Sequence, residues 1–150
     1  MDVRPINSGW CNGDLGIIAC LWTSACALED ADLETEVLSL AALEAERRVE
    51  DVEPDHRQNP ALCHGGAGRA HIFNRLFQGT GHERFQEASL YWMRHVLDLV
   101  EARLRDPDPP LEPGFLMGLA GVGLMLTAAV TDTPPSWDCV LLASSPAAAA

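Results

Sequence analysis

The chain has 150 residues, of which 47% are hydrophobic and 21% are charged, and its formal net charge is −12. This composition is typical of one globular domain and excludes a disordered chain. The negative charge excludes nucleic acid and anionic membranes as partners bound through a basic surface. Because all ten basic residues are Arg, mechanisms that need a lysine amine are excluded as well.

The five cysteines are an odd number and do not follow the spacing of a secreted disulfide framework. Residues 1–9 contain no apolar core of the kind found in signal peptides. Both observations favour a cytoplasmic location, where cysteines remain reduced and fill the core or bind metals.

The elements expected along the chain are helices. Residues 14–28 are apolar on most faces, and residues 32–49 have the apolar spacing of an amphipathic helix. The pattern repeats with an apolar helix at 65–77 and an amphipathic helix at 82–105. Each pair indicates an inner helix followed by an outer, charged one, and no run predicts a β-hairpin.

A third apolar run lies between Glu112 and Asp132, where nineteen consecutive residues carry no charge. Such a run is long enough to span a membrane, but it contains Pro113 and four glycines and has no basic flank. We expect a helix that is buried on all sides, and no membrane span. Residues 50–60 and 106–113 are expected to be linkers, and 144–150 a disordered tail after one domain at 1–143.

Three segments of one form, an apolar residue, two variable residues and Gly-x-x-Gly, open the three apolar runs. Their first glycines, Gly13, Gly65 and Gly118, are 52 and 53 residues apart, so we interpret the chain as repeated helical hairpins. Glycines at this spacing lie on one helix face, where the missing Cβ lets inner helices approach each other closely. The sequence therefore predicts an all-α fold in which these glycines have a structural role and no chemical one.

Two of the three segments carry candidate metal ligands just before the glycines, Cys11 in the first and Cys63 with His64 in the second. In equivalent hairpins the two thiols lie at neighbouring helix N-termini, where the positive helix end lowers a thiol pKa. Two thiolates and one imidazole suit Zn²⁺, and three protein ligands leave one coordination position open. We predict a zinc site that activates a thiol as a nucleophile.

A fourth ligand from His71 or Cys26 would convert this centre into a structural site. Because His71 lies two helical turns beyond His64, we favour three ligands. The remaining cysteines are expected to be inert core residues: Cys20, Cys26 and Cys139. The remaining histidines are expected to face solvent: His56, His82 and His95.

These motifs resemble the lanthionine synthetase C-like family. The matching segments are Trp10-Cys-Asn-Gly-Asp-Leu-Gly-Ile17, Leu62-Cys-His-Gly65, Gly118-Leu-Ala-Gly-Val-Gly-Leu124 and Trp137-Asp-Cys-Val-Leu-Leu142. The match runs through nearly all of this chain and covers only the C-terminal portion of a complete family member. Asn12 and Leu15 stand where the family usually has Tyr and Pro, which bears on the shape of the loop.

The resemblance implies a partial α/α toroid of helical hairpins around a central zinc, with Cys11, Cys63 and His64 as its ligands by motif position. The family's cyclases add a peptide cysteine thiolate to dehydroalanine or dehydrobutyrine and so form thioether (lanthionine) rings, while eukaryotic relatives use glutathione. The expected partner is therefore a dehydrated precursor peptide or a small thiol.

The acid/base His and Asp proposed for the family lie on earlier hairpins, so the resemblance assigns no catalytic residue in this chain. An incomplete ring leaves apolar flanks open, from which we expect self-association or an N-terminal cyclase partner chain. Three functions remain open: a zinc-dependent cyclase component, a non-catalytic zinc and thiol binding module, and an inactive truncated remnant.

Overall fold

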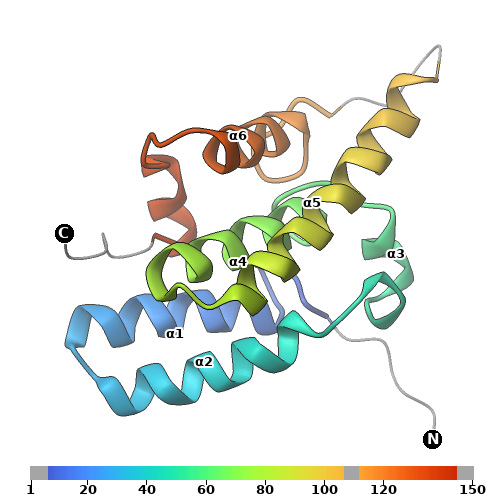
Figure 1. Cartoon of the computed structure of the whole chain (residues 1–150). Helices are drawn as coiled ribbons and strands as arrows, with labels where there is room; N and C mark the ends of the chain where they lie inside the picture. The colour runs from blue at the N-terminus through green and yellow to red at the C-terminus, as the bar shows by residue number, and fades with distance from the viewer. Residues whose placement is uncertain (1–6, 107–111, 145–150) are drawn as a thin grey trace, which may run out of the picture.

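The computed structural model describes residues 7–106 and 112–144 of the chain. These residues are helical and contain no β-strand, which confirms the predicted all-α fold. Two helical hairpins follow each other, α1 (Asp14–Leu28) with α2 (Ala31–Ala45) and α4 (Gly66–Thr80) with α5 (Glu83–Leu104). The helix α6 (Leu119–Val130) lies on the other side of α4 from α1 (Figure 1). The inner helices α1, α4 and α6 thus stand in the order that a partial toroid requires.

The three glycine segments form the same backbone turn at the starts of α1, α4 and α6. In each, the first helical N–H donates a hydrogen bond to the carbonyl seven residues earlier: Asp14 N to Asn7 O at 3.2 Å, Gly66 N to Asn59 O at 2.9 Å, and Leu119 N to Glu112 O at 2.7 Å. A Cβ on the second glycine of each motif would overlap a carbonyl oxygen, at 1.8 Å for Gly16 and at 2.0 Å for Gly68 and Gly121. The turn therefore requires glycine there.

The turns lie side by side and are joined by backbone hydrogen bonds. Trp10 N donates to Cys63 O at 2.7 Å, and Cys63 N donates to Leu116 O at 2.9 Å. Each turn is thus held to the next one by its own backbone, at the ends of the inner helices where the candidate ligands are placed.

The segment between α2 and α4 is more structured than the sequence indicates. The predicted helix at 32–49 ends at Ala45, because the chain turns into the 3-10 helix η1 (Val49–Asp51), where Asp51 Oδ2 accepts a hydrogen bond from Arg48 N at 2.8 Å. A short helix, α3 (Pro54–Arg57), follows and begins with the proline that suits a first helical position. The predicted linker at 50–60 therefore contains two helical turns.

The core is centred on α4, which packs against α1, α5 and α6 and buries residues on every face. On α6, by contrast, only one face is covered, with Val122 and Met125 buried and Thr127 and Val130 exposed. The prediction that this helix is buried on all sides is wrong, because α4 is the one described helix that packs extensively along it. No helix of the described part of the chain is long and apolar enough to cross a membrane.

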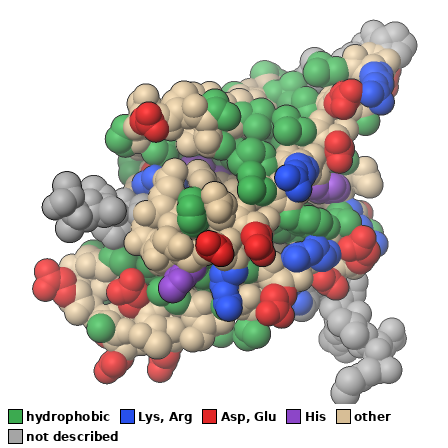
Figure 2. Space-filling model, viewed as in Figure 1, with side chains coloured by type: hydrophobic (Ala, Val, Ile, Leu, Met, Phe, Trp, Pro, Cys, Tyr) green, Lys and Arg blue, Asp and Glu red, His purple; other side chains and the backbone are tan. Residues whose placement is uncertain are grey.

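The flank of the first hairpin is open and partly apolar. Ile17, Leu40 and Leu43 are exposed and line a groove of about 220 Å³ between α1 and α2. Acidic side chains are spread along this edge of the molecule, and hydrophobic side chains are visible between α5 and α6 (Figure 2). Self-association through these surfaces stays a prediction. In the expected tail at 144–150, residues 145–150 lie outside the described part of the chain.

Candidate metal centre

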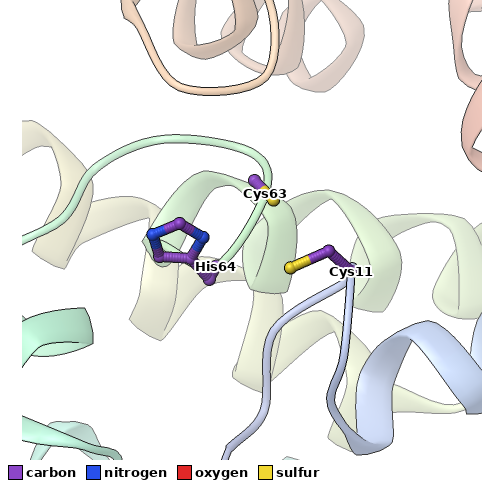
Figure 3. A group of neighbouring side chains, drawn as sticks. All are labelled: Cys11, Cys63 and His64. Carbon is purple, nitrogen blue, oxygen red and sulfur yellow. The ribbon is translucent and has the colours of Figure 1, made fainter.

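The turns before α1 and α4 bring together three side chains that are far apart in the sequence. Cys11 lies in the first turn, and Cys63 and His64 lie in the second (Figure 3). The hydrogen bonds from Trp10 N and Cys11 N to Cys63 O, at 2.7 and 3.4 Å, fix one turn against the other. The placement of these side chains is thus a direct result of the repeated glycine turns.

One ligand atom from each of Cys11, Cys63 and His64 lies within 4.8 Å of the others. The two sulfur atoms and one ring nitrogen of His64 face a common space (Figure 3). In tetrahedral zinc sites with Zn–S bonds of about 2.3 Å, ligand atoms are about 3.8 Å apart. The three atoms therefore need to approach each other by only about 1 Å to fit zinc.

The thiol of Cys63 resists deprotonation in the metal-free chain. Burial, followed by the hydrogen bond and the charge of Cys11, together raise its pKa to about 11. The prediction that the helix end lowers the thiol pKa is therefore wrong for Cys63 in the metal-free chain, because burial dominates. A dication would offset this penalty, since it stabilises adjacent thiolates directly. The donor set and its geometry fit zinc.

The ring of His64 is in contact with His56, which we expected from the sequence to face solvent. The His56 ring packs on the His64 ring with centroids 4.8 Å apart, and its side chain is only 14% exposed. The expectation that His56 faces solvent is wrong, because α3 folds that segment back against the site. Burial lowers the pKa of His56, and the nearby His64 and Arg69 lower it further.

The alternative fourth ligands are placed apart from the cluster. His71 is buried and its Nε2 donates to Asp138 Oδ2 at 3.1 Å, while Cys26 lies near the far end of α1. Neither belongs to the group of ligand atoms, and no other His, Cys, Asp or Glu among residues 7–106 and 112–144 joins it. The arrangement of three ligands with an open position is what a catalytic rather than a structural zinc site would have.

The burial of several other cysteines and histidines differs from what the sequence predicts. Cys139 is exposed and Cys20 is half-buried, so neither is a fully buried core residue. His82 is exposed as predicted. His95 is not solvent-facing, because its ring packs beside Trp92 and its Nε2 bonds the Arg57 carbonyl at 2.7 Å.

A groove of about 450 Å³ leads along the start of α1 to Cys11. It is lined by apolar residues such as Trp10, Ile17 and Leu21, and also by Cys20. Cys11 is exposed and lines the groove, so the groove reaches the cluster at this ligand.

Comparison with known proteins agrees with this architecture. The family model described as lanthionine synthetase C-like protein matches residues 2–142. No significant match was found among curated proteins or among solved structures. The match extends over all three turns and over the segment that follows α6, so it includes every element described above. The chain belongs to the lanthionine synthetase C-like family.

Proposed function

We propose that Cys11, Cys63 and His64 bind one zinc ion and that the chain activates a thiol as the metal-binding component of a thioether-forming cyclase. The observation that carries this proposal is the cluster of three ligand atoms within 4.8 Å, which no fourth ligand of the described residues completes. Zinc bound there would supply the positive charge that keeps a substrate thiol deprotonated at neutral pH.

The chain's own residues would hold and expose the reacting groups. Cys63 and His64 are half-buried and anchor the site, whereas Cys11 is exposed at the end of the groove beside α1. A cysteine-bearing segment lying in this groove would present its sulfur at the open position.

The proposed reaction is an addition that balances without an oxidant or a leaving group. A new C–S bond forms between the peptide thiolate and the β-carbon of dehydroalanine or dehydrobutyrine, and the α-carbon takes up a proton. We assign no acid or base for this proton in the chain, and we propose that an N-terminal cyclase partner supplies them. The reduced thiols that the reaction needs favour the cytoplasm.

The proposal is tested by the metal content of the purified chain after zinc loading and removal of free metal. We expect about one zinc per chain, lost in Cys11→Ala and in Cys63→Ala, since removing one ligand of three weakens the site strongly. Cys139→Ala is the matched control, because this exposed cysteine is outside the cluster. A wild-type chain without zinc, or a Cys63→Ala variant that keeps it, contradicts the proposal.

A second candidate function is a zinc and thiol binding module without turnover. It is favoured by one observation: the cluster consists of Cys11, Cys63 and His64, all of which are needed as ligands, and no described residue is assigned as the acid or base of the addition. A zinc-loaded chain mixed with a dehydrated peptide distinguishes the two functions. Loss of free peptide thiol supports the cyclase component, whereas thiol binding without consumption, even with the partner present, supports the module.

A further inference from the structure

The imidazole of His64 is confined on several sides by parts of the chain outside the ligand set. The His56 ring lies against it at 4.8 Å between centroids, with the ring planes tilted by 39°. A Cβ built on Gly9 would lie 2.9 Å from His64 Cβ, so the first turn approaches this residue closely. Arg69, which is 1% exposed, donates from Nη1 to the His64 carbonyl oxygen at 3.1 Å. The backbone of His64 is thus fixed by Arg69 and Gly9, and the ring by His56.

The segment that carries His56 is itself held in place by the outer helix of the second hairpin. His95 Nε2 on α5 bonds the Arg57 carbonyl at 2.7 Å, and Arg103 Nη2 donates to the Gln58 carbonyl at 3.0 Å. The Arg57 side chain adds a bond from its Nε to Val52 O at 2.9 Å. Hydrogen bonds to α5 and to the preceding segment therefore locate a four-residue helix that has little intrinsic stability of its own.

The packing of the His56 ring on the His64 ring limits the orientations that the His64 imidazole can adopt. Groups that hydrogen-bond a metal ligand commonly fix the orientation of its ring, and their loss weakens metal binding about 10- to 100-fold. A ring packed on the ligand restricts the same side-chain torsions by steric contact. His64 needs such a fixed orientation, because its ring must present one nitrogen toward two sulfur atoms on neighbouring turns (Figure 3). Without a neighbour, a half-exposed imidazole would occupy several rotamers.

We propose that His56 is a positioning residue of the Cys11, Cys63 and His64 centre, which it serves by packing its ring on the His64 ring. This inference rests on the proposed metal binding of those three residues. The role belongs to the planar ring, so an aromatic side chain without nitrogen performs it as well. It extends the functional site from the two ligand turns to α3, and it links the site to α5 through the bonds of His95 and Arg103.

The test uses the full chain loaded with Co²⁺, whose absorption reports both thiolate ligation and the geometry of the ligands. The variants are His56→Ala, which removes the ring, and His56→Phe, which restores a ring without nitrogen. His82→Ala is the matched control, because it removes an exposed histidine that contacts only Phe85 among the ring pairs. Affinity is measured by competition with a chromogenic chelator.

We expect His56→Ala to bind cobalt about 10-fold more weakly than wild type, with altered ligand-field bands. His56→Phe and His82→Ala should stay within about threefold of wild type and keep the wild-type spectrum. Wild-type affinity and spectrum in His56→Ala overturn the positioning role. A His56→Phe variant as weak as His56→Ala overturns the ring-packing explanation. Far-UV circular dichroism establishes that each variant is folded.

A metal-free measurement separates this inference from the proposed function. In the imidazole nitrogen–proton NMR spectrum of the metal-free chain, we expect the His64 signals to move toward averaged values in His56→Ala and to stay in place in His82→Ala. Unchanged His64 signals in His56→Ala overturn the inference. A wild-type chain that binds no cobalt overturns the proposed function, whereas the NMR spectrum still decides whether His56 orients the His64 ring.

Discussion

The turn before α4 and the turn before α6 have the same backbone and different side chains. Both close with a hydrogen bond from the first helical N–H to the carbonyl seven residues back, and both require glycine beside a carbonyl at 2.0 Å. The positions of Cys63 and His64 in one turn are those of Leu116 and Met117 in the other. The comparison teaches that the glycines build the turn and that the ligands are an independent addition to it.

The largest effect expected from this comparison is that the zinc site can be moved from the turns before α1 and α4 to the turns before α4 and α6. Cys11→Ala with His64→Asn should abolish zinc binding. Adding Leu116→Cys and Met117→His should restore about one zinc per chain, with Cys63 acting where Cys11 acted before. The reason is that Cys63 N bonds Leu116 O at 2.9 Å, as Cys11 N bonds Cys63 O at 3.4 Å.

Metal content by mass spectrometry is the measurement for this transfer, and Met117 is a tolerant position because it is 49% exposed. The control is Leu116→Cys alone in the zinc-free double variant, which should gain little metal because it lacks an imidazole. A folded quadruple variant without zinc would show that the third turn differs from the second in more than its side chains.

A smaller effect is expected from the glycines of α6, which form a matched pair on one helix. Gly121→Ala places a Cβ 2.0 Å from Phe115 O and should lower the free energy of unfolding by about 3 kcal/mol, as over-packing does. Gly123→Ala meets nothing within 4 Å and should raise it by up to about 1 kcal/mol through helix propensity. Urea unfolding of both variants measures the difference, and equal effects would contradict the turn geometry.

Features that depend on local pattern and repetition could be predicted from the sequence. The apolar and amphipathic runs gave α1, α4 and α5 within a few residues, and the spacing of Gly13, Gly65 and Gly118 gave the equivalent turns. Because equivalent turns lie side by side, the meeting of Cys11 with Cys63 and His64 followed from the repeat.

Features that depend on tertiary contacts could not be predicted in this way. The position of His56 depends on α3, whose four residues have no periodicity and which is held by side chains of α5. The exposed face of α6 depends on which neighbours are present, and its uniform apolarity carries no sign of that. The burial of Asp138 likewise depends on His71 and Arg75 of α4, which the sequence does not place beside it.

The third repeat also differs from the first two in how it ends. Where α2 and α5 follow the inner helices of the earlier repeats, the chain after α6 forms the 3-10 helix η2 (Ser136–Leu141) and returns to α1 and α4. Leu141 O accepts a hydrogen bond from Trp10 Nε1 at 2.8 Å, and Leu142 O accepts one from Thr23 Oγ1 at 2.9 Å. Asp138 is buried against His71 and Arg75 of α4.

The smallest effect we predict concerns this polar anchor and its dependence on pH. Burial lowers the pKa of His71 below its ordinary 6.5, although the hydrogen bond to Asp138 opposes the shift. Burial alone would raise the pKa of Asp138, but the hydrogen bonds from His71 and Ser144 and the charge of Arg75 bring it below 3.8. Both groups thus bind protons more weakly in the folded chain than in the unfolded chain.

Stability must therefore fall as the solution becomes more acidic, first below pH 6.5 through His71 and then below pH 3.8 through Asp138. One proton contributes at most about 1.4 kcal/mol per pH unit. Urea unfolding at pH 7.5 and 5.5, with a chelator present, should show a smaller loss in His71→Gln than in wild type. His82→Gln, at an exposed position, should keep the wild-type loss. An equal loss in His71→Gln would mean that groups other than His71 cause the loss between pH 7.5 and 5.5, and that this histidine serves packing against Trp137.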